Sequence, residues 1–228
     1  RLEVTTVSFS LDDFYLTKAE RSYLGATVHP LLETRGVPGT HDVQLAIDSI
    51  QSLAAGEKTV ITRFDKSIDD RAPANSLKTT EGKIGLIVLE GWCLGAKPQS
   101  SDKLAQPINS LEENDDRDGL WRNYVNRALE QDYPPLFELL DELIMLQAPT
   151  FDTVFNWRLE QEQKMVKRLE KEGIQAGSGV MSEPQILRFI SYFQRVTENI
   201  LEEMPKRADH LFKLGQSREI THYSQPKA

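Results

Sequence analysis

Acidic side chains follow two apolar segments of the sequence, and paired carboxylates in such positions can do chemistry. Asp12 and Asp13 come directly after "VTTVSFSL", and Glu90 comes directly after "IGLIVL". If both segments end at one crevice, their carboxylates could hold Mg²⁺ or accept a proton from a substrate hydroxyl, as phosphoryl transfer requires. An Asp-Asp pair is also common turn chemistry, and Glu-Gly can simply end a strand, so the spacing leaves a purely structural role open.

The two segments that carry these acids have the composition of buried strands. "LEVTTVSFS" has apolar side chains on both faces, which predicts a strand covered on both sides, and the near-continuous apolar run "IGLIVLEGW" predicts a second strand. Between them, "GTHDVQLAIDSIQSLAAG" repeats apolar residues at helical spacing, with Thr40 as the expected N-cap and Gly56 as the stop. Strand, helix and strand favour a right-handed crossover and a parallel sheet, so the predicted fold class is α/β. Ligands bind at the carboxyl ends of such strands, where the acids lie.

The rest of the sequence predicts irregular connections followed by helices. Residues 57–83 alternate short apolar pieces with charged and turn-forming residues, and residues 93–118 are polar. "RADHLFKLG" is expected to form a short final strand. Helices are expected at "GLWRNYVNRALEQ" with Asp118 as N-cap, at "PPLFELLDELIML", at "TVFNWRLEQEQKMVKRLEKEG" ending on Gly173, and after a capping box of Ser182 and Gln185.

Composition narrows the class of protein. The 228 residues carry a formal net charge of -8, which argues against a broad, sequence-independent grip on nucleic acid. A single cysteine, Cys93, excludes an intramolecular disulfide and a cysteine-based zinc site, and it fits a reducing compartment, so a cytoplasmic location is expected. The longest apolar runs are far shorter than the roughly 20 residues of a membrane-spanning helix, so no membrane partner is expected.

Eight segments, in order and spacing, resemble the glycerate 3-kinase group of P-loop kinases. This group contains the plant-type D-glycerate 3-kinases and related bacterial and yeast kinases, and it is similar to uridine kinase, phosphoribulokinase and pantothenate kinase. The resemblance covers almost the whole chain and implies a single kinase-like domain over residues 1–228, with a three-layer parallel sheet and with residues 93–180 as a helical insertion and lid region. The segments are "SLDDFYLT", "RGVPGTHD", "RFDKSIDDRAP", "VLEGWCLG", "PINSLE", "DGLWRNYVN", "WRLEQEQKM" and "FISYFQRVTENIL".

The activity that this resemblance implies is transfer of a phosphoryl group from ATP, with Mg²⁺, to a small molecule. D-glycerate, converted to 3-phosphoglycerate, is the expected substrate, and a plastid location is the alternative to the cytoplasm for a plant source. Another small hydroxyl substrate (a nucleoside, pantothenate or a sugar phosphate) and a non-catalytic interaction module are the alternatives. A metal-dependent phosphatase is disfavoured because "LDDFY" lacks the Asp-x-Asp spacing of its nucleophile.

The resemblance also implies roles for individual residues. Asp12 would accept the proton of the substrate hydroxyl and lie beside the metal ion, and Glu90 would lie near the Mg²⁺ that bridges the nucleotide phosphates. Tyr15 would border the acceptor pocket. Arg158 would belong to a lid and approach the transferred phosphate; the alternative is a solvent-facing helix with ion pairs four residues apart, which explains Lys164, Lys167 and Arg168 better than Arg158.

Basic residues are needed because glycerate is an anion. Lys66 and Arg71 are the expected ligands of its carboxylate, and the alternative is an exposed loop with local salt bridges. His41 is expected near the acceptor, or else simply at the first turn of its helix.

One motif of the group does not occur between Arg1 and Ala228. No run of the form Gly-x-x-x-x-Gly-Lys-Ser/Thr is present, although its backbone N–H groups and lysine would cradle the phosphates. In related kinases this loop follows the first strand and precedes the first helix. The resemblance therefore predicts a natural N-terminal segment ahead of Arg1 that carries that strand and the loop, and it predicts that residues 1–228 alone are inactive.

Overall fold

The computed structural model describes residues 4–171 and 181–226. The chain divides into two compact units, here called the N-terminal unit (Arg1–Pro107 and Asp115–Asp141) and the C-terminal unit (Ile108–Asn114 and Glu142–Ala228). Among the described residues, no helix combines the length and apolar character needed to cross a membrane.

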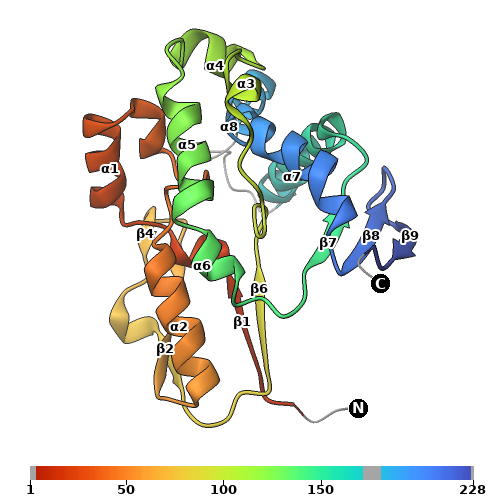
Figure 1. Cartoon of the computed structure of the whole chain (residues 1–228). Helices are drawn as coiled ribbons and strands as arrows, with labels where there is room; N and C mark the ends of the chain where they lie inside the picture. Colours follow the sequence, from red (N-terminus) through yellow and green to blue (C-terminus); the bar gives the residue numbers. More distant parts are fainter. Residues whose placement is uncertain (1–3, 172–180, 227–228) are drawn as a thin grey trace. The chain divides into compact units, whose positions relative to one another are not determined.

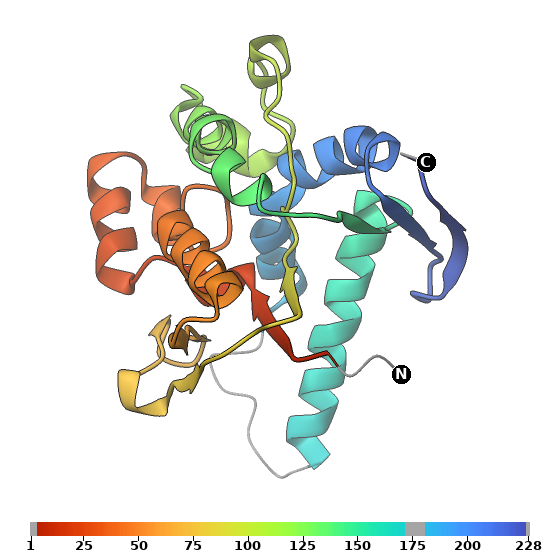
Figure 2. The ribbon, with the colours of Figure 1, turned by 60° about the horizontal axis from the view of Figure 1, so that its bottom comes forward.

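A parallel pair of strands forms the centre of the N-terminal unit (Figures 1 and 2). Strand β1 (Thr6–Ser10) pairs with β6 (Leu86–Glu90) in parallel, and Ser10 lies opposite Glu90. This arrangement confirms the predicted parallel pairing. The prediction that β1 is covered on both faces is wrong: Phe9 is buried, but Thr6 and Ser8 on the opposite face are exposed. Leu86 and Val88 of β6 are 50% and 42% exposed.

Helical segments follow β1 in the sequence, and the longest of them is α2. The 3-10 turn η1 (Leu11–Phe14) leads to α1 (Lys18–Thr27), η2 (Pro30–Glu33) and α2 (Val43–Ala55). The predicted stop at Gly56 is confirmed, with the left-handed φ of 76° that favours glycine. The N-cap is Asp42 rather than the predicted Thr40, because the Thr40 hydroxyl is used in the preceding turn, where it bonds Gly36 N and Val37 O.

Residues 57–83, predicted to be irregular, form short antiparallel pairs. Strand β2 (Thr59–Ile61) pairs with β5 (Lys78–Thr80), and β3 (Phe64–Asp65) pairs with β4 (Asp70–Arg71). The β3–β4 pair lies between β2 and β5 in sequence, and a 3-10 turn, η3 (Ala74–Ser76), connects β4 to β5. Two- and three-residue strands leave too short a pattern to be recognised from alternation, which explains the wrong prediction.

Short helices follow β6. These are α3 (Ser101–Leu104), α4 (Ser110–Asp115), α5 (Leu120–Gln131) and α6 (Pro134–Phe137). Asp118 was expected to cap α5, but Gly119 is the N-cap residue, and the buried Asp116 carboxylate accepts bonds from the backbone N–H groups of Trp121 (2.7 Å) and Arg122 (3.2 Å).

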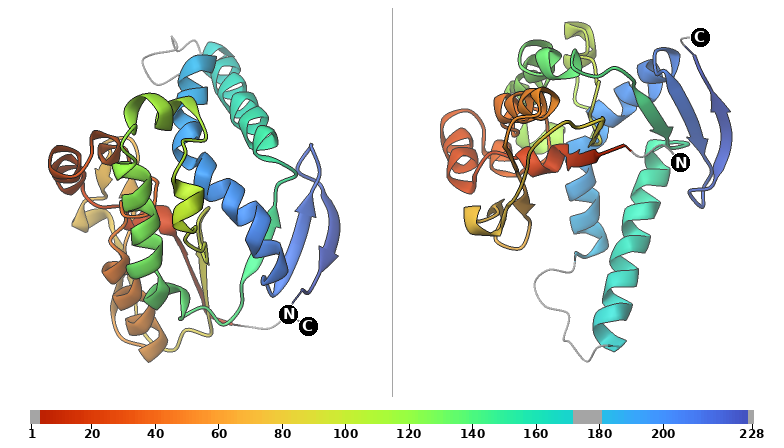
Figure 3. Two further views of the ribbon diagram at one scale, coloured as in Figure 1. Left: turned by 45° about the horizontal axis from the view of Figure 1, so that its top comes forward. Right: turned by 90° about the horizontal axis from the view of Figure 1, so that it is seen from below.

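The C-terminal unit combines a three-stranded sheet with two long helices that pack against each other (Figure 3). Strand β7 (Ile144–Gln147) is parallel to β8 (His210–Leu214), which is antiparallel to β9 (Ile220–Ser224). The helices are α7 (Phe151–Lys171) and α8 (Glu183–Glu203), and α8 is followed by η4 (Met204–Lys206).

Three expectations for this unit are confirmed, and two are wrong. Helix α7, the capping box of Ser182 and Gln185 before α8, and the strand in "RADHLFKLG" form as predicted. The prediction that this strand is the final one is wrong, because β9 follows it. The end of "PPLFELLDELIML" forms β7 instead of helix, because α6 ends at Phe137. The predicted stop at Gly173 lies outside the described residues. Between Glu112 and Arg195, a buried ion pair of 2.6 Å joins the start of this unit to α8.

Candidate functional site

The turn η1 places Asp12 at the carboxyl end of β1. Ser10 caps this turn: its hydroxyl accepts a bond from Asp12 N (3.3 Å), and its own N–H donates to Asp13 Oδ2 (2.9 Å). The turn lies close to the end of β6, since a Cβ added at Gly91 would lie 2.7 Å from Leu11 Cβ. Glycine at position 91 therefore lets the acid-bearing ends of β1 and β6 approach each other.

Each oxygen of the Asp12 carboxylate accepts a hydrogen bond from a predicted site residue. The Tyr15 hydroxyl donates to Oδ1 at 2.6 Å, and Lys66 Nζ donates to Oδ2 at 2.6 Å. Burial acts to raise the pKa of Asp12, but the hydrogen bonds from Lys66 and Tyr15 and the charge of Lys66 outweigh it, so this pKa lies below its usual value. Asp12 is therefore ionised and held in one orientation.

Asp13 has a different environment from its neighbour. Its Oδ2 accepts both the Ser10 N–H and a bond from Arg63 Nη1 (2.7 Å). Arg63 also donates to Ser8 O and lies 5.8 Å from the centre of the Phe9 ring. These contacts tie β1, η1 and the segment before β3 together, so the two adjacent acids have separate surroundings.

His41 is buried beside Asp12, in a cluster of aromatic rings. Its ring stacks on Tyr15, with centroids 4.8 Å apart, and its Nδ1 lies 2.5 Å from the Tyr133 hydroxyl. The Phe64 ring packs edge-on against Tyr15 at 5.1 Å. Burial lowers the pKa of His41 from 6.5 to about 4, against the opposing effect of the Asp12 charge. The imidazole is therefore neutral near pH 7.

Lys66 and Arg71 differ in their exposure and in the hydrogen bonds that they donate. The Lys66 side chain is 60% exposed, with its ammonium group on Asp12. Arg71 is half-buried: its Nη2 donates to Asp42 Oδ2 (2.7 Å) and its Nε to Tyr15 O (3.3 Å). The guanidinium thus supports the backbone that carries Tyr15 and the cap of α2.

Glu90 and Asp12 offer different chemistry to a metal ion. Glu90 is exposed at the end of β6, as an oxygen ligand for Mg²⁺ should be when the ion is shared with nucleotide phosphates. Each Asp12 oxygen already accepts a bond, and one of those bonds comes from an ammonium group. Glu90 is therefore accessible as an oxygen ligand for Mg²⁺, whereas Asp12 would have to give up its bond to Lys66 or Tyr15 to serve as one.

Arg158 lies on α7 in the C-terminal unit. Its Nη2 forms an ion pair with the buried Glu162, one turn along the helix, and its guanidinium lies 5.4 Å from the centre of the Phe189 ring. Its Nη1 donates to Gln161 (3.0 Å), while its buried Nε finds no partner among the described residues. These contacts correspond to the helix-surface alternative considered for Arg158.

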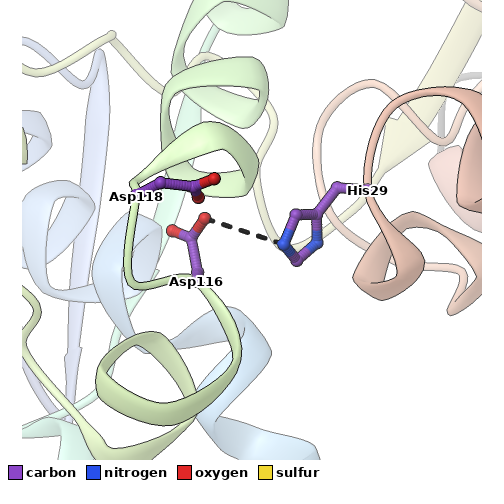
Figure 4. A group of neighbouring side chains, drawn as sticks. All are labelled: His29, Asp116 and Asp118. Carbon is purple, nitrogen blue, oxygen red and sulfur yellow. Dashed lines mark ion pairs between the residues drawn. The ribbon is translucent and has the colours of Figure 1, made fainter.

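A second cluster of possible metal ligands lies in the N-terminal unit (Figure 4). Within the described part of the chain, ligand atoms of His29, Asp116 and Asp118 lie within 4.8 Å of one another. His29 Nδ1, however, accepts the Leu31 N–H (3.2 Å), so the neutral imidazole carries its proton on Nε2, the atom 3.9 Å from Asp116. Asp116 also pairs with the buried Arg122 at 2.9 Å. We therefore assign this cluster to the capping of η2 and α5.

Tyr133 is a site residue that the sequence reasoning missed. It lies 92 positions after His41 and just before the paired prolines of α6, and it is fully buried. No local spacing connects it to the acidic segments, so only the fold brings it to the site.

The known proteins that resemble this chain in sequence are named as kinases. No family model matches the chain. The chain is 33% identical over 203 residues to an uncharacterized kinase, mug58, of Schizosaccharomyces pombe, covering 85% of this chain and 69% of that protein. It is 29% identical over 198 residues to the chloroplastic D-glycerate 3-kinase of Arabidopsis thaliana, covering 82% of this chain and 39% of that protein. It is also 26% identical to a probable ATP-dependent kinase, TDA10, of Saccharomyces cerevisiae, over 71% of this chain and 57% of that protein.

Solved structures share the fold. A D-glycerate 3-kinase from Cryptococcus neoformans superimposes with a TM-score of 0.77 at 25% identity, covering 97% of this chain and 80% of that one. The YGR205w protein superimposes with a TM-score of 0.70 at 22% identity, over 97% of this chain and 78% of that one. The chain therefore belongs to the kinase family that includes the D-glycerate 3-kinases.

Proposed function

We propose that this chain is part of an ATP-dependent kinase that phosphorylates D-glycerate to 3-phosphoglycerate. The observation that carries the proposal is the ionised Asp12, placed by η1 at the carboxyl end of a parallel strand with Lys66 and Tyr15 on its two oxygens. Two relatives named D-glycerate 3-kinase support the choice of substrate. We infer a cytoplasmic location, or a plastid one in a plant source.

Asp12 is the proposed general base. Its carboxylate accepts the proton of the substrate hydroxyl, and its lowered pKa keeps it ionised and ready for that proton near pH 7. The Tyr15 hydroxyl stays on Oδ1 and orients the carboxylate, which leaves Oδ2 for the substrate once Lys66 moves. ATP with Mg²⁺, when bound, supplies the phosphoryl group, and Glu90 is the proposed ligand of the metal ion.

Lys66 is the proposed partner of the glycerate carboxylate. Its side chain is long and mostly exposed, so it can exchange the Asp12 carboxylate for the substrate carboxylate without loss of buried packing. Arg71 is proposed in support, because its guanidinium already holds the Tyr15 backbone and Asp42. His41 is proposed to line the same pocket, stacked on Tyr15.

Arg158 is proposed to stabilise charge on the transferred phosphate. This role requires the guanidinium to exchange its ion pair with Glu162 for the phosphate. Arg158→Lys in the full-length gene product is expected to lower kcat with little change in the KM for glycerate. An unchanged kcat would assign Arg158 to the helix surface alone.

The test is an assay of coupled ATP consumption. The full-length gene product and residues 1–228 are assayed in parallel with D-glycerate, uridine, pantothenate and ribulose 5-phosphate, with Mg²⁺ present. We expect consumption with D-glycerate by the full-length product. Consumption with a different acceptor would overturn the substrate but keep the kinase activity. Binding of ATP without turnover on any of these acceptors would favour the non-catalytic alternative.

A further inference from the structure

His41 contains a buried hydrogen-bonding atom that the site does not satisfy. Its Nε2 is shielded from solvent and finds no hydrogen-bond partner among the described residues. A buried polar atom left unpaired loses its hydrogen bonds to water without replacement, so such atoms in native structures call for an explanation. His41 is only 5% exposed, and its ring is fixed by stacking on Tyr15 and by a bond to Tyr133.

The hydrogen bonds around Tyr133 decide which ring nitrogen carries the proton. The Gly39 N–H donates to the Tyr133 hydroxyl oxygen (3.2 Å), so the proton of that hydroxyl is available for another acceptor. His41 Nδ1 lies 2.5 Å from this hydroxyl, and donation of the hydroxyl proton to it leaves Nδ1 as the unprotonated nitrogen. A neutral imidazole with a bare Nδ1 carries its proton on Nε2. The unsatisfied atom is therefore a donor.

This donor belongs to the same cluster as the proposed base. The two ring nitrogens point in different directions, so Nε2 faces away from Tyr133. The ring itself stacks on Tyr15, whose hydroxyl donates to Asp12, and the charge of Asp12 acts on the imidazole. A substrate oxygen that enters this cluster would meet a neutral, preoriented N–H group.

We propose that Tyr133 is a positioning residue that holds His41 in the Nε2–H form, and that this N–H donates a hydrogen bond to an oxygen of the substrate. The identity of that substrate as D-glycerate rests on the proposed function, but the assignment of the proton to Nε2 does not. The arrangement selects for a substrate with an acceptor oxygen at this point. A substrate that presents an N–H or a methyl group there leaves the buried donor unpaired.

The first experiment is to measure the protonated nitrogen of His41 by NMR. Nitrogen-15 shifts of the imidazole at pH 7 distinguish the protonated from the unprotonated ring nitrogen, and the His41 signals are assigned by their loss in His41→Gln. We expect protonation at Nε2 in the natural sequence, and a mixture of the two forms in Tyr133→Phe. Protonation at Nδ1 in the natural sequence would overturn the proposal.

A matched control exists in the C-terminal unit. The Tyr223 hydroxyl lies 2.8 Å from His210 Nδ1, at an exposed position on the β8–β9 pair. Tyr223→Phe removes the same kind of contact from a different histidine. It is expected to leave the His41 nitrogen shifts unchanged, and a change of equal size to that in Tyr133→Phe would overturn the specific role of Tyr133.

The second experiment is titration with D-glycerate, read at His41 and at Lys66. We expect shifts at both residues. The amide of glutamine can replace an Nε2 donor, so His41→Gln should bind glycerate within a few-fold of the natural sequence, whereas His41→Leu should bind about tenfold more weakly or worse. Shifts at Lys66 without any change at His41 would overturn the donor role and keep the proposed function. If D-glycerate shifts the signals of neither His41 nor Lys66, and His41 is still protonated at Nε2, D-glycerate is not the substrate and the tautomer assignment stands.

Discussion

Acidification is expected to destabilise the N-terminal unit through His41. In the folded state, burial lowers the pKa of His41 to about 4, and in the unfolded chain the residue returns to its usual 6.5. Because the unfolded chain binds this proton more readily, the free energy of unfolding falls as the pH decreases from about 6.5 toward 4. Above pH 6.5 the residue is neutral in both states and contributes no pH dependence.

The size of the effect follows from the difference between the two pKa values. Each unit of pKa corresponds to about 1.4 kcal/mol, so between pH 8 and pH 5 His41 removes about 2 kcal/mol of stability. The full difference, reached below pH 4, is about 3 kcal/mol. Either value is a sizeable share of the stability of a domain of this size.

The assay is urea denaturation at a series of pH values, for the natural sequence and for His41→Gln. All other titrating groups are shared, so the difference between the two curves isolates His41. Between pH 8 and pH 5 the natural sequence should lose about 2 kcal/mol more than His41→Gln. His222→Gln, which alters an exposed histidine of β9, is the control and should follow the natural sequence. Parallel curves for the natural sequence and His41→Gln would refute the assignment of His41 as a neutral buried residue.

Three further predictions concern charges and close contacts. Glu112→Ala leaves the buried Arg195 without its carboxylate and should lower the free energy of unfolding by about 3 kcal/mol or more. Asp116→Asn removes a buried charge that caps α5 and should cost about 2 kcal/mol. Gly91→Ala places a carbon 2.7 Å from Leu11 Cβ and should cost about 1–3 kcal/mol, because backbone near Asp12 must shift. All three are measured by urea denaturation at pH 7.

Matched controls separate these effects from nonspecific ones. Glu160 forms exposed ion pairs with Lys164 and Arg218, so Glu160→Ala should lower the free energy of unfolding much less than Glu112→Ala does. Asp118 is exposed and, among the described residues, accepts a bond from the Leu120 N–H alone (3.2 Å), so Asp118→Asn should cost less stability than Asp116→Asn. Equal losses within either pair would contradict the role assigned to burial. If Gly91→Ala leaves the urea concentration at the midpoint of unfolding unchanged, the close approach of η1 to β6 is contradicted.

The parallel pairing of β1 and β6 could be predicted because each strand is a long apolar run and a clear amphipathic helix lies between them. The stop at Gly56 could be predicted for a similar reason, since a left-handed residue is needed there. Strand β7 could not, because "LIML" fits a strand or a helix equally well and only its pairing with β8 decides. The N-cap of α2 was misplaced by two residues because Thr40 and Asp42 are both good caps and the preceding turn uses one of them.

In the site, too, some features could be predicted from the sequence and others could not. The place of Asp12 beyond β1 could be predicted from the strand end, and the structure shows that Lys66 and Tyr15 both donate to its carboxylate. The hydrogen bond from Arg71 to Asp42 forms because the β3–β4 pair brings Arg71 close to the N-cap of α2. Strands of two residues are too short to be recognised in the sequence, so this bond could not be predicted. Tyr133 reaches His41 only through tertiary packing, so no pattern near either residue indicated it.

The central claim is that Asp12, and not its neighbour, activates the substrate hydroxyl. The most direct test is kcat for D-glycerate in the full-length gene product carrying Asp12→Asn or Asp13→Asn. A positioned base contributes about 10²–10⁴-fold, so Asp12→Asn should lower kcat by at least about 100-fold. Asp13→Asn, which only loosens the bonds to Ser10 and Arg63, should lower it by much less. A kcat for Asp12→Asn close to that of the natural sequence, or an equal loss in both variants, would contradict this account.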